Sequence, residues 1–314
     1  MPSAKTTDTA VQAAMPDTGS SFLTEGSAAA KGRTTIDDKA ESDAPLVSVL
    51  LSVFNEKDEA LLFAAVRSII EQTCTDWEMI LYDDGSDAAG REAIRRAASL
   101  DPRIHHIIGA ENRGLAYGLN ESLKVARGRY IARLDDDDIS APDRLARQVA
   151  FLEAHPEYQW VGCNLELFDA EGSWGRRIFP AVPQKRDFLK YSPYAHPSVI
   201  FCRETLDATG GYRKRRKAED YEIFMRLHAE GYQGYNLQEC LYYYREDRRF
   251  SRPHTYASRV EEVRVRYKGF QRLGILNPGT LPYVIKPLLV GLLPRSAARY
   301  KHRLRKEMHV EGND

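Results

Sequence analysis

The fold is constrained most by an alternation of short apolar segments with segments of helical periodicity, which begins directly after Pro45. The first apolar segment, 46–53, is rich in aliphatic and β-branched residues, as in a strand buried on both faces. Between Asp58 and Gln72 the apolar residues instead recur with the spacing of an amphipathic helix. The pattern continues with strands expected at 77–82, 104–108 and 129–134 and helices at 88–100 and 115–126, the second ending near Gly128 as its C-cap. This alternation predicts a parallel α/β sheet.

The second half of the chain shows a less regular pattern, in which short strands separate longer helical segments. We expect helices at 142–154, 218–229 and 256–273 and strands at 160–168, 197–201 and 239–244. The expected fold class is therefore α/β, with a mostly parallel sheet flanked by helices in a single domain that carries a helical C-terminal extension.

Composition narrows the class of protein. Lys plus Arg equals Asp plus Glu, 45 of each, so there is no overall basic field that would favour nucleic acid as a partner. The 4 cysteines lie far apart, which fits neither a zinc site nor a disulfide framework and predicts reduced thiols in a cytoplasm. No secretory signal and no apolar run long enough to span a membrane is visible, so a cytoplasmic location is expected.

The two ends of the chain differ in composition from the part between them. Residues 1–44 are rich in Ala, Ser, Thr, Gly and Asp and bury too little apolar surface to offset their ordering entropy, so we expect a disordered tail, with a short docking arm as the alternative. The domain is expected at 45–250 and a helical, basic extension at 251–314. In this extension, the apolar segment 281–293 precedes a run of basic residues. We expect 281–306 to contact the cytoplasmic face of an anionic membrane peripherally. The alternative is a helix that packs on the domain and exposes its charged side to solvent.

Polar and acidic side chains follow three of the predicted strands at the point where each strand ends. Asn55 and Glu56 follow the first strand, Asp83 and Asp84 the second, and the four aspartates 135–138 the fourth. In parallel α/β sheets the ligand binds outside the carboxyl ends of the strands. Adjacent carboxylates repel one another unless a cation neutralises them, and carboxylate oxygens are ligands for Mg²⁺. This edge is therefore a predicted site for a divalent cation, with a solvated acidic surface as the alternative.

Other sites with this residue chemistry fit less well. An EF-hand loop beginning at Asp135 needs Gly at its sixth position and Glu at its twelfth, where this chain has Ser140 and Ala146. A phosphatase of the haloacid dehalogenase type also places Asp-x-Asp after a strand, but it does not require the acidic ends of the preceding strands. The glycine-rich motifs of dinucleotide and P-loop sites are absent.

Five segments carry a resemblance to a known family. They are 47–56 (VSVLLSVFNE), 68–87 (SIIEQTCTDWEMILYDDGSD), 111–140 (ENRGLAYGLNESLKVARGRYIARLDDDDIS), 196–213 (HPSVIFCRETLDATGGYR) and 218–227 (AEDYEIFMRL). In their order and spacing, the chain from Pro45 to about Arg245 resembles the family 2 glycosyltransferases of the GT-A fold. The resemblance implies an inverting, metal-dependent glycosyltransferase that takes a sugar from a nucleotide sugar, most often a UDP-sugar, with Mg²⁺ or Mn²⁺ as the cation.

The resemblance also implies roles for particular residues. Asn55 and Glu56 would line the base and ribose pocket, and Asp84 would accept a hydrogen bond from the uracil N–H. The aspartate run would be the family's Asp-x-Asp, with Asp137 in direct contact with the metal and Asp135 contacting ribose, the metal or its bound water. A shift of one residue in this register stays open.

The remaining implied roles concern catalysis and the phosphates. Asp220, in a Glu-Asp pair like the family's, would be the general base that removes the proton of the acceptor hydroxyl, and a carboxylate that stabilises a helix N-terminus is the alternative. Arg245 would reach the pyrophosphate, because arginine pairs bidentately with phosphate. Asp138 would face away and cap the helix that begins near Pro142. The Gln-x-x-Arg-Trp motif of processive members is absent, which favours transfer of single sugars.

The predicted function is transfer of a sugar to a hydroxyl of a glycan or lipid-linked acceptor, as in synthesis of a surface polysaccharide, without nucleic acid as a partner. Two alternatives stay open. A sugar nucleotidyltransferase would need a glycine-rich, basic loop after the first strand, where the chain has Phe54-Asn55-Glu56-Lys57. A catalytically weak scaffold that binds sugar nucleotides would be expected to have lost acids that are present here.

Overall fold

The computed structural model describes residues 44–56, 58–213, 218–247 and 255–292. In these ranges the strands are β1 (Val47–Val53), β2 (Trp77–Asp83), β3 (Ile104–Ile108), β4 (Tyr130–Leu134), β5 (Ile139–Ser140), β6 (Trp160–Asp169), β7 (Gly172–Arg177), β8 (Ile200–Cys202) and β9 (Gly234–Arg245). The helices are α3 (Glu59–Ile70), α4 (Ala88–Ala98), α5 (Leu115–Val125), α6 (Arg144–Ala154), α7 (Arg203–Thr209), α8 (Glu219–Ala229), α9 (Tyr256–Leu273) and α10 (Leu281–Leu292), with 3-10 turns at Lys185–Leu189 and His196–Ser198. The predicted tail, apart from Ala44, lies outside the described residues, as do 293–314.

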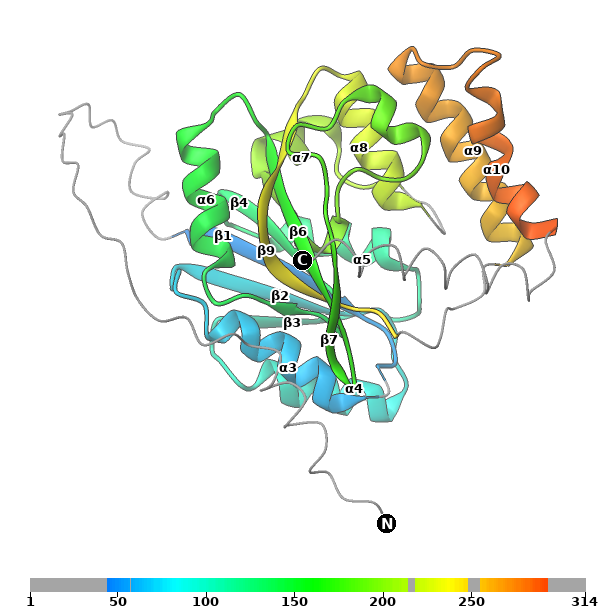
Figure 1. The fold of residues 1–314 in the computed structure, drawn as a ribbon. Helices are drawn as coiled ribbons and strands as arrows, with labels where there is room; N and C mark the ends of the chain where they lie inside the picture. Colours follow the sequence, from blue (N-terminus) through cyan, green and yellow to red (C-terminus); the bar gives the residue numbers. More distant parts are fainter. Residues whose placement is uncertain (1–43, 57, 214–217, 248–254, 293–314) are drawn as a thin grey trace.

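The strands form one sheet in the order β3-β2-β1-β4-β8-β6-β9-β5, with β7 paired to β6 (Figure 1). The first four pair in parallel, with β1 between β2 and β4. β8 runs antiparallel to β4 and β6, whereas β6 and β9 are parallel. The predicted α/β fold is confirmed, and because β1, β2 and β4 are parallel neighbours, their carboxyl ends lie at one edge of the sheet.

Two layers of helices bury the two faces of this sheet (Figure 1). Alternate residues of β1, Val47 to Val53, face a cluster formed with α3, α4 and α6. Leu50, between them, faces the opposite cluster with α5, α8 and α9. Each such fully buried side chain stabilises the fold by roughly 1.5–3 kcal/mol relative to an exposed one. The sheet is therefore covered on both sides, as the apolar strand segments predict.

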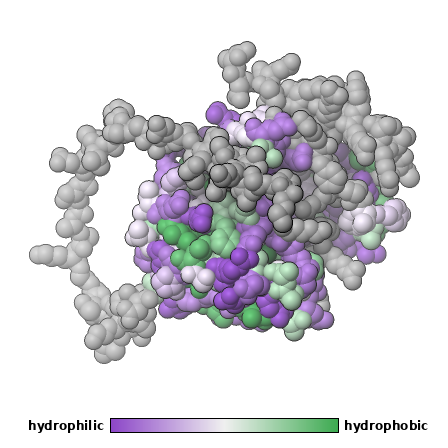
Figure 2. Space-filling model, turned by 90° about the horizontal axis from the view of Figure 1, so that it is seen from below, coloured by the Kyte–Doolittle hydropathy of each residue, from purple (hydrophilic) through white to green (hydrophobic). Residues whose placement is uncertain are grey.

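The solvent side of α3 and α4 carries both polar and apolar residues. Figure 2, seen from below, shows hydrophilic residues interspersed with hydrophobic ones on this side of the molecule. On α4, Ile94 and Ala97 are buried, whereas Arg95 pairs with Glu92 at 2.6 Å and Arg96 reaches Glu59 on α3. These surface pairs orient the helices but add little stability in water.

Several boundaries differ from the sequence-based expectation. Gly128 is not a C-cap, because α5 ends with Ala126 as its cap. Gly128 instead lies against β1, where an added Cβ would be 2.4 Å from the backbone nitrogen of Ser48, so close packing explains the glycine. The segment 197–201 is divided between a 3-10 turn, which ends at Ser198, and the strand β8, which begins at Ile200, and β9 begins earlier than expected, at Gly234. The short elements β5, β7 and α7 carry no period long enough to predict.

The C-terminal helices cover one end of the molecule (Figure 1). Phe270 and Leu273 of α9 and Val284 of α10 are buried in the same cluster as Phe224 of α8. Among the described residues, no helix is both long and apolar enough to cross a membrane. The division of the chain at 44 and 250 stays a prediction.

Candidate active site

Hydrogen bonds tie the loop after β1 to the loop after β2. Asn55 has a left-handed backbone conformation, with φ of 50°, which asparagine tolerates better than most residues. Its backbone N–H donates to Ser86 Oγ at 3.0 Å, and its Oδ1 accepts the N–H of Asp87 at 2.8 Å. Asn55 therefore lies at the predicted ligand edge and orders the neighbouring loop there.

The two aspartates at the end of β2 have different partners. Asp83 is buried and accepts the backbone N–H of Ser86 at 2.7 Å, which holds the turn. Asp84 is also buried, and its two oxygens accept the backbone N–H groups of Arg113 at 2.9 Å and Gly114 at 2.8 Å. Asp84 thus fastens the loop before α5. Each carboxylate oxygen has a second lone pair, so the predicted contact with a uracil N–H is compatible with these bonds and stays a prediction.

A buried arginine holds the first residue of the aspartate run. Arg133, in β4, is 4% exposed, and its Nη2 donates to Asp135 Oδ1 at 2.5 Å. The backbone N–H of Asp135 donates to Tyr242 Oη at 3.1 Å, which ties the loop to β9. Because a buried charge requires a partner, Arg133 fixes the position of Asp135. The sequence analysis missed Arg133 because it stands within an apolar segment and its partner follows only after the strand ends.

The last aspartate of the run has a structural role. Asp138 is 1% exposed, and its Oδ1 accepts the backbone N–H of Arg245 at 2.7 Å. Burial, together with the charges of Asp135 and Asp137, raises its pKa well above the ordinary value. Asp138 therefore points away from solvent, but it does not cap the next helix, whose N-cap is Asp143. The same bond brings the backbone of Arg245 beside the aspartate loop, and the contact of its side chain with pyrophosphate stays a prediction.

Negative charge accumulates around the middle of the loop. Burial raises the pKa of Asp136 to about 8, and the charges of Asp135, Asp137 and Glu56 contribute to this rise. Glu56 is therefore close enough for its charge to raise the pKa of Asp136. Its own Oε1 accepts the backbone N–H of Asp58 at 2.8 Å. The carboxylates at the end of β1 and at the end of β4 therefore repel one another, and a bound cation would reduce this repulsion.

The donor set fits a hard divalent cation. Asp135, Asp136 and Asp137 offer carboxylate oxygens on one tight loop, and their mutual repulsion contributes to the raised pKa of Asp136. Within the described ranges, no three or more His, Cys, Asp or Glu side chains are arranged to hold a metal by themselves. Mg²⁺ usually binds through one or two carboxylates plus substrate phosphates, so such a preformed cage is not required.

Asp220 lies in the first turn of α8, after Ala218 with its left-handed φ of 60°. Burial, and then the neighbouring charge of Glu219, raise the pKa of Asp220 to about 6, while Arg133 acts in the opposite direction. The charge of Arg133 therefore lowers the pKa of Asp220, while its guanidinium donates a hydrogen bond to Asp135. A carboxylate with a pKa near 6 is able to accept a proton at neutral pH.

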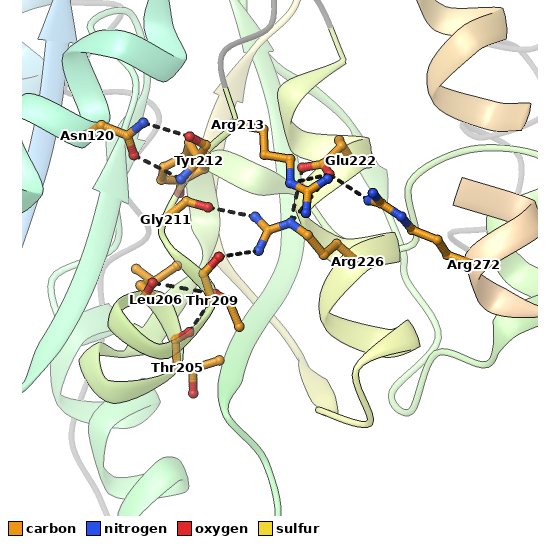
Figure 3. Close-up of polar contacts among 10 residues, drawn as sticks. All are labelled: Asn120, Thr205, Leu206, Thr209, Gly211, Tyr212, Arg213, Glu222, Arg226 and Arg272. Atoms are coloured by element: carbon orange, nitrogen blue, oxygen red, sulfur yellow. Dashed lines mark hydrogen bonds and ion pairs between the residues drawn. The ribbon is translucent and has the colours of Figure 1, made fainter. Parts of the chain in front are cut away.

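Hydrogen bonds hold Tyr212, which lies near the end of the described range 58–213, in place (Figure 3). Asn120, on α5, donates from Nδ2 to the carbonyl of Tyr212 at 2.6 Å and accepts its backbone N–H at 2.9 Å. The Tyr212 hydroxyl is 2.9 Å from Nε2 of His196, which is buried. Burial, and then the charge of Arg133, lower the pKa of His196 well below its ordinary value, so this imidazole is neutral. The sequence analysis did not foresee Tyr212, because only the fold brings it to Arg133 and Asp220.

Comparisons with known proteins agree with this architecture. Residues 48–224 match the profile of the family described as "Glycosyl transferase family 2". The "Putative glycosyltransferase EpsE" of Bacillus subtilis (strain 168) is 36% identical over 275 residues, which cover 86% of this chain and 98% of that protein. The "UDP-Gal:alpha-D-GlcNAc-diphosphoundecaprenol beta-1,3-galactosyltransferase" of Escherichia coli is 26% identical, over 83% of this chain and 96% of its own length. The mannosyltransferase PcManGT of Pyrobaculum calidifontis, solved with GDP-Man and Mn²⁺, shares the fold with a TM-score of 0.54 at 22% identity, over 83% of this chain and 80% of that one.

Proposed function

This chain belongs to glycosyl transferase family 2, and we propose on that premise that it transfers a sugar, with inversion, from a nucleotide sugar to a hydroxyl of a glycan or lipid-linked acceptor. The observation that carries the proposal is the position of Arg133. Its buried guanidinium binds Asp135 of the aspartate loop, and its charge lowers the pKa of Asp220 in α8, which supports a single site that includes both aspartates.

The donor would lie over the carboxyl ends of β1, β2 and β4. Asn55 and Glu56 would border the base and ribose, with Asp84 accepting a base N–H. A UDP-sugar is the first candidate, because the Escherichia coli relative is named for UDP-Gal, and a GDP-sugar is the second, because PcManGT was solved with GDP-Man. The position of the Arg245 backbone beside the aspartate loop supports a contact of its side chain with the diphosphate.

Asp137 and Asp135 would hold Mg²⁺ or Mn²⁺, which when bound would stabilise the charge that develops on the departing nucleoside diphosphate. The bond of Arg133 to Asp135 keeps that carboxylate in place before the donor arrives. Asp138 is not part of this donor set, because it is buried and its Oδ1 accepts the backbone N–H of Arg245.

Asp220 would act as general base on the acceptor side. The acceptor oxygen attacks the anomeric carbon as the bond from that carbon to the diphosphate oxygen breaks, and Asp220 takes the hydroxyl proton. A single displacement from the face opposite the leaving group inverts the configuration. A pKa of about 6 suits this role, because Asp220 is then mostly ionised at pH 7 yet still basic enough to accept a proton.

The acceptor is proposed to belong to the synthesis of a surface polysaccharide and to be presented at a membrane. The name of the Escherichia coli relative, which includes a diphosphoundecaprenol acceptor, supports a lipid-linked substrate. On α10, Leu281, Ile285 and Leu289 recur every fourth residue and are exposed, which supports peripheral contact of this helix with lipid. The basic residues that follow, which would favour anionic lipid, lie outside the described residues.

A screen of nucleotide sugars tests the proposed function. Each is added with Mn²⁺, and thermal stabilisation and nucleotide release are measured. A true donor should raise the melting temperature, since a ligand at 100 times its Kd stabilises by about 2.7 kcal/mol, and should be hydrolysed slowly. A donor that stabilises without any release of nucleotide would favour the scaffold alternative, and the absence of any stabilising nucleotide sugar would contradict the proposal.

A further inference from the structure

The aspartate loop, residues 135–138, is held only weakly by its own backbone. The N–H of Asp138 donates to the carbonyl of Asp135 at 3.5 Å, the upper limit for a hydrogen bond. The carboxylates of this loop also repel one another, which contributes to the raised pKa of Asp136. The shape of the loop therefore depends on contacts with groups outside it.

The hydroxyl of Tyr242, in β9, contacts both ends of this loop. Its Oη accepts the backbone N–H of Asp135 at 3.1 Å. Burial raises the pKa of Asp138, whereas hydrogen bonds from two groups of β9, the Arg245 backbone and the Tyr242 side chain, lower it. One hydroxyl therefore interacts with the first and the last residue of the loop.

The hydrogen-bonding capacity of the two side chains supports this arrangement. The Tyr242 hydroxyl accepts one N–H and has one proton to donate. On Asp138, Oδ1 accepts the N–H of Arg245 at 2.7 Å, whereas Oδ2 is buried and has no other partner within the ranges that the structure describes. The phenol therefore donates to Oδ2. Both side chains are buried, so this bond does not compete with water.

Packing fixes the ring of Tyr242 behind the loop. Tyr242 is fully buried, and the guanidinium of Arg144, which is also buried, lies 5.2 Å from the centre of its ring. Arg144 donates from Nη2 to the carbonyl of Arg133 at 3.2 Å and from Nη1 to that of Ser198 at 3.4 Å. The same arginine thus contacts the tyrosine ring and the strand that leads into the loop.

We propose that Tyr242 is a positioning residue for the metal ion, because its hydroxyl holds both ends of the aspartate loop so that Asp135 and Asp137 present their carboxylates together. The metal would be bound by these aspartates and not by Tyr242, whose hydroxyl already has two partners. A loop that is held in shape loses less freedom when it binds a cation, so this hydroxyl raises the affinity for Mn²⁺. The inference rests on the proposed function, because it deepens the metal half of that site.

Titration with Mn²⁺, followed by the electron paramagnetic resonance signal of the free ion, tests this inference on wild type and Tyr242→Phe. Each protein is first saturated with UDP, or with GDP if GDP stabilises the wild type more. Tyr242→Phe removes only the hydroxyl, and we expect it to bind Mn²⁺ at least about tenfold more weakly, because a hydrogen bond to a carboxylate is lost. The number of Mn²⁺ ions bound per protein should stay the same.

The separation of affinity from stoichiometry distinguishes positioning from unfolding. A partly unfolded Tyr242→Phe would bind fewer ions per protein with wild-type affinity, and that result would overturn the inference. The melting temperature of each protein is measured alongside. With a chelator in place of Mn²⁺, the nucleotide should bind the variant and wild type alike, because its base and ribose are expected at the ends of β1 and β2.

Tyr243→Phe is the matched control. It removes a hydroxyl from the next residue of β9, which is also buried. Burial raises the pKa of that hydroxyl, and the titratable groups that act on it lie outside the aspartate loop: Glu166, Cys240 and Asp143. We therefore expect Tyr243→Phe to bind Mn²⁺ with wild-type affinity.

The inference is also overturned if Tyr242→Phe binds Mn²⁺ as tightly as wild type, or if Tyr243→Phe loses as much affinity as Tyr242→Phe. A wild-type protein that binds no Mn²⁺ with either nucleotide contradicts the proposed metal site and this inference together. Failure of the proposed function as a whole has a different signature, since wild-type protein would then release no nucleotide from any nucleotide sugar.

Discussion

Asp220 lies in the first turn of α8, and its pKa is raised. The proposed mechanism requires that its carboxylate accept a proton. Asp220→Asn keeps the size of the side chain and removes the base. We predict that it lowers kcat by about 10²–10⁴-fold while the affinity for the nucleotide sugar stays the same. Glu230→Gln, at the other end of the helix, is the matched control and should keep full activity. Wild-type turnover in Asp220→Asn would remove this residue from the mechanism.

The same group predicts the dependence of the rate on pH. Because burial and Glu219 raise the pKa of Asp220 to about 6, the carboxyl is protonated and inactive as a base below that pH. The rate of sugar transfer should rise with pH, reach half its plateau near pH 6 and level off above about pH 7. The residual activity of Asp220→Asn should lack this acidic limb. An acidic limb of the same midpoint in that variant would assign the titration to another group.

At the scale of elements, Asp138 joins the loop after β4 to the end of β9 through the N–H of Arg245. Asp138→Ala removes a buried acceptor and leaves that partly buried N–H without its partner, and we predict a loss of about 1–3 kcal/mol in the free energy of unfolding. Asp138→Asn keeps an oxygen acceptor and should lie close to wild type. Urea unfolding of the two variants measures the difference, and equal stability of the two would show that the bond does not support the loop.

The elements differ in how well the sequence predicts them. The alternation of apolar strands and amphipathic helices predicts β1 to β4 and α3 to α5 closely, because each carries a full period of its pattern. β5 escapes prediction, because two residues are too few to carry a period, and β8 is predicted only in part, since the strand expected at 197–201 overlaps it at residues 200 and 201.

The candidate site shows a similar division. The acidic ends of β1, β2 and β4 could be predicted to lie together, because parallel neighbouring strands end at one edge. The surroundings of Arg133 and Asp135 could not, because Tyr242, which binds the backbone of Asp135, and Asp220, whose pKa the charge of Arg133 lowers, come from distant parts of the chain. The functions of Asp84 and Arg245 as ligands stay predictions, since their observed bonds are to groups of the protein itself.

For the whole molecule, the proposed membrane contact of α10 depends on its exposed apolar residues. Leu281→Ser/Ile285→Ser/Leu289→Ser removes them together, and we predict at least about tenfold weaker binding to vesicles that contain anionic lipid. Binding of the wild type should also weaken with salt, because the basic segment adds a screened attraction. Tyr256→Ser, which removes an exposed aromatic from α9, is the control. Sedimentation with vesicles measures both, and equal binding of the triple variant and wild type would contradict the contact.

The central claim is that carboxylates from separate strand ends bind a nucleoside diphosphate through a divalent cation. Calorimetric titration tests this claim. The nucleoside diphosphate of the best stabilising donor is titrated, once with Mn²⁺ and once with a chelator, into wild type, Asp137→Asn and the control Asp143→Asn. Asp143 pairs with Arg147 on α6. We predict tight, Mn²⁺-dependent binding for wild type and Asp143→Asn, and loss of the Mn²⁺-dependent part for Asp137→Asn. Wild-type affinity that is the same with Mn²⁺ and with chelator, or an Asp137→Asn variant that binds like wild type, would contradict the account.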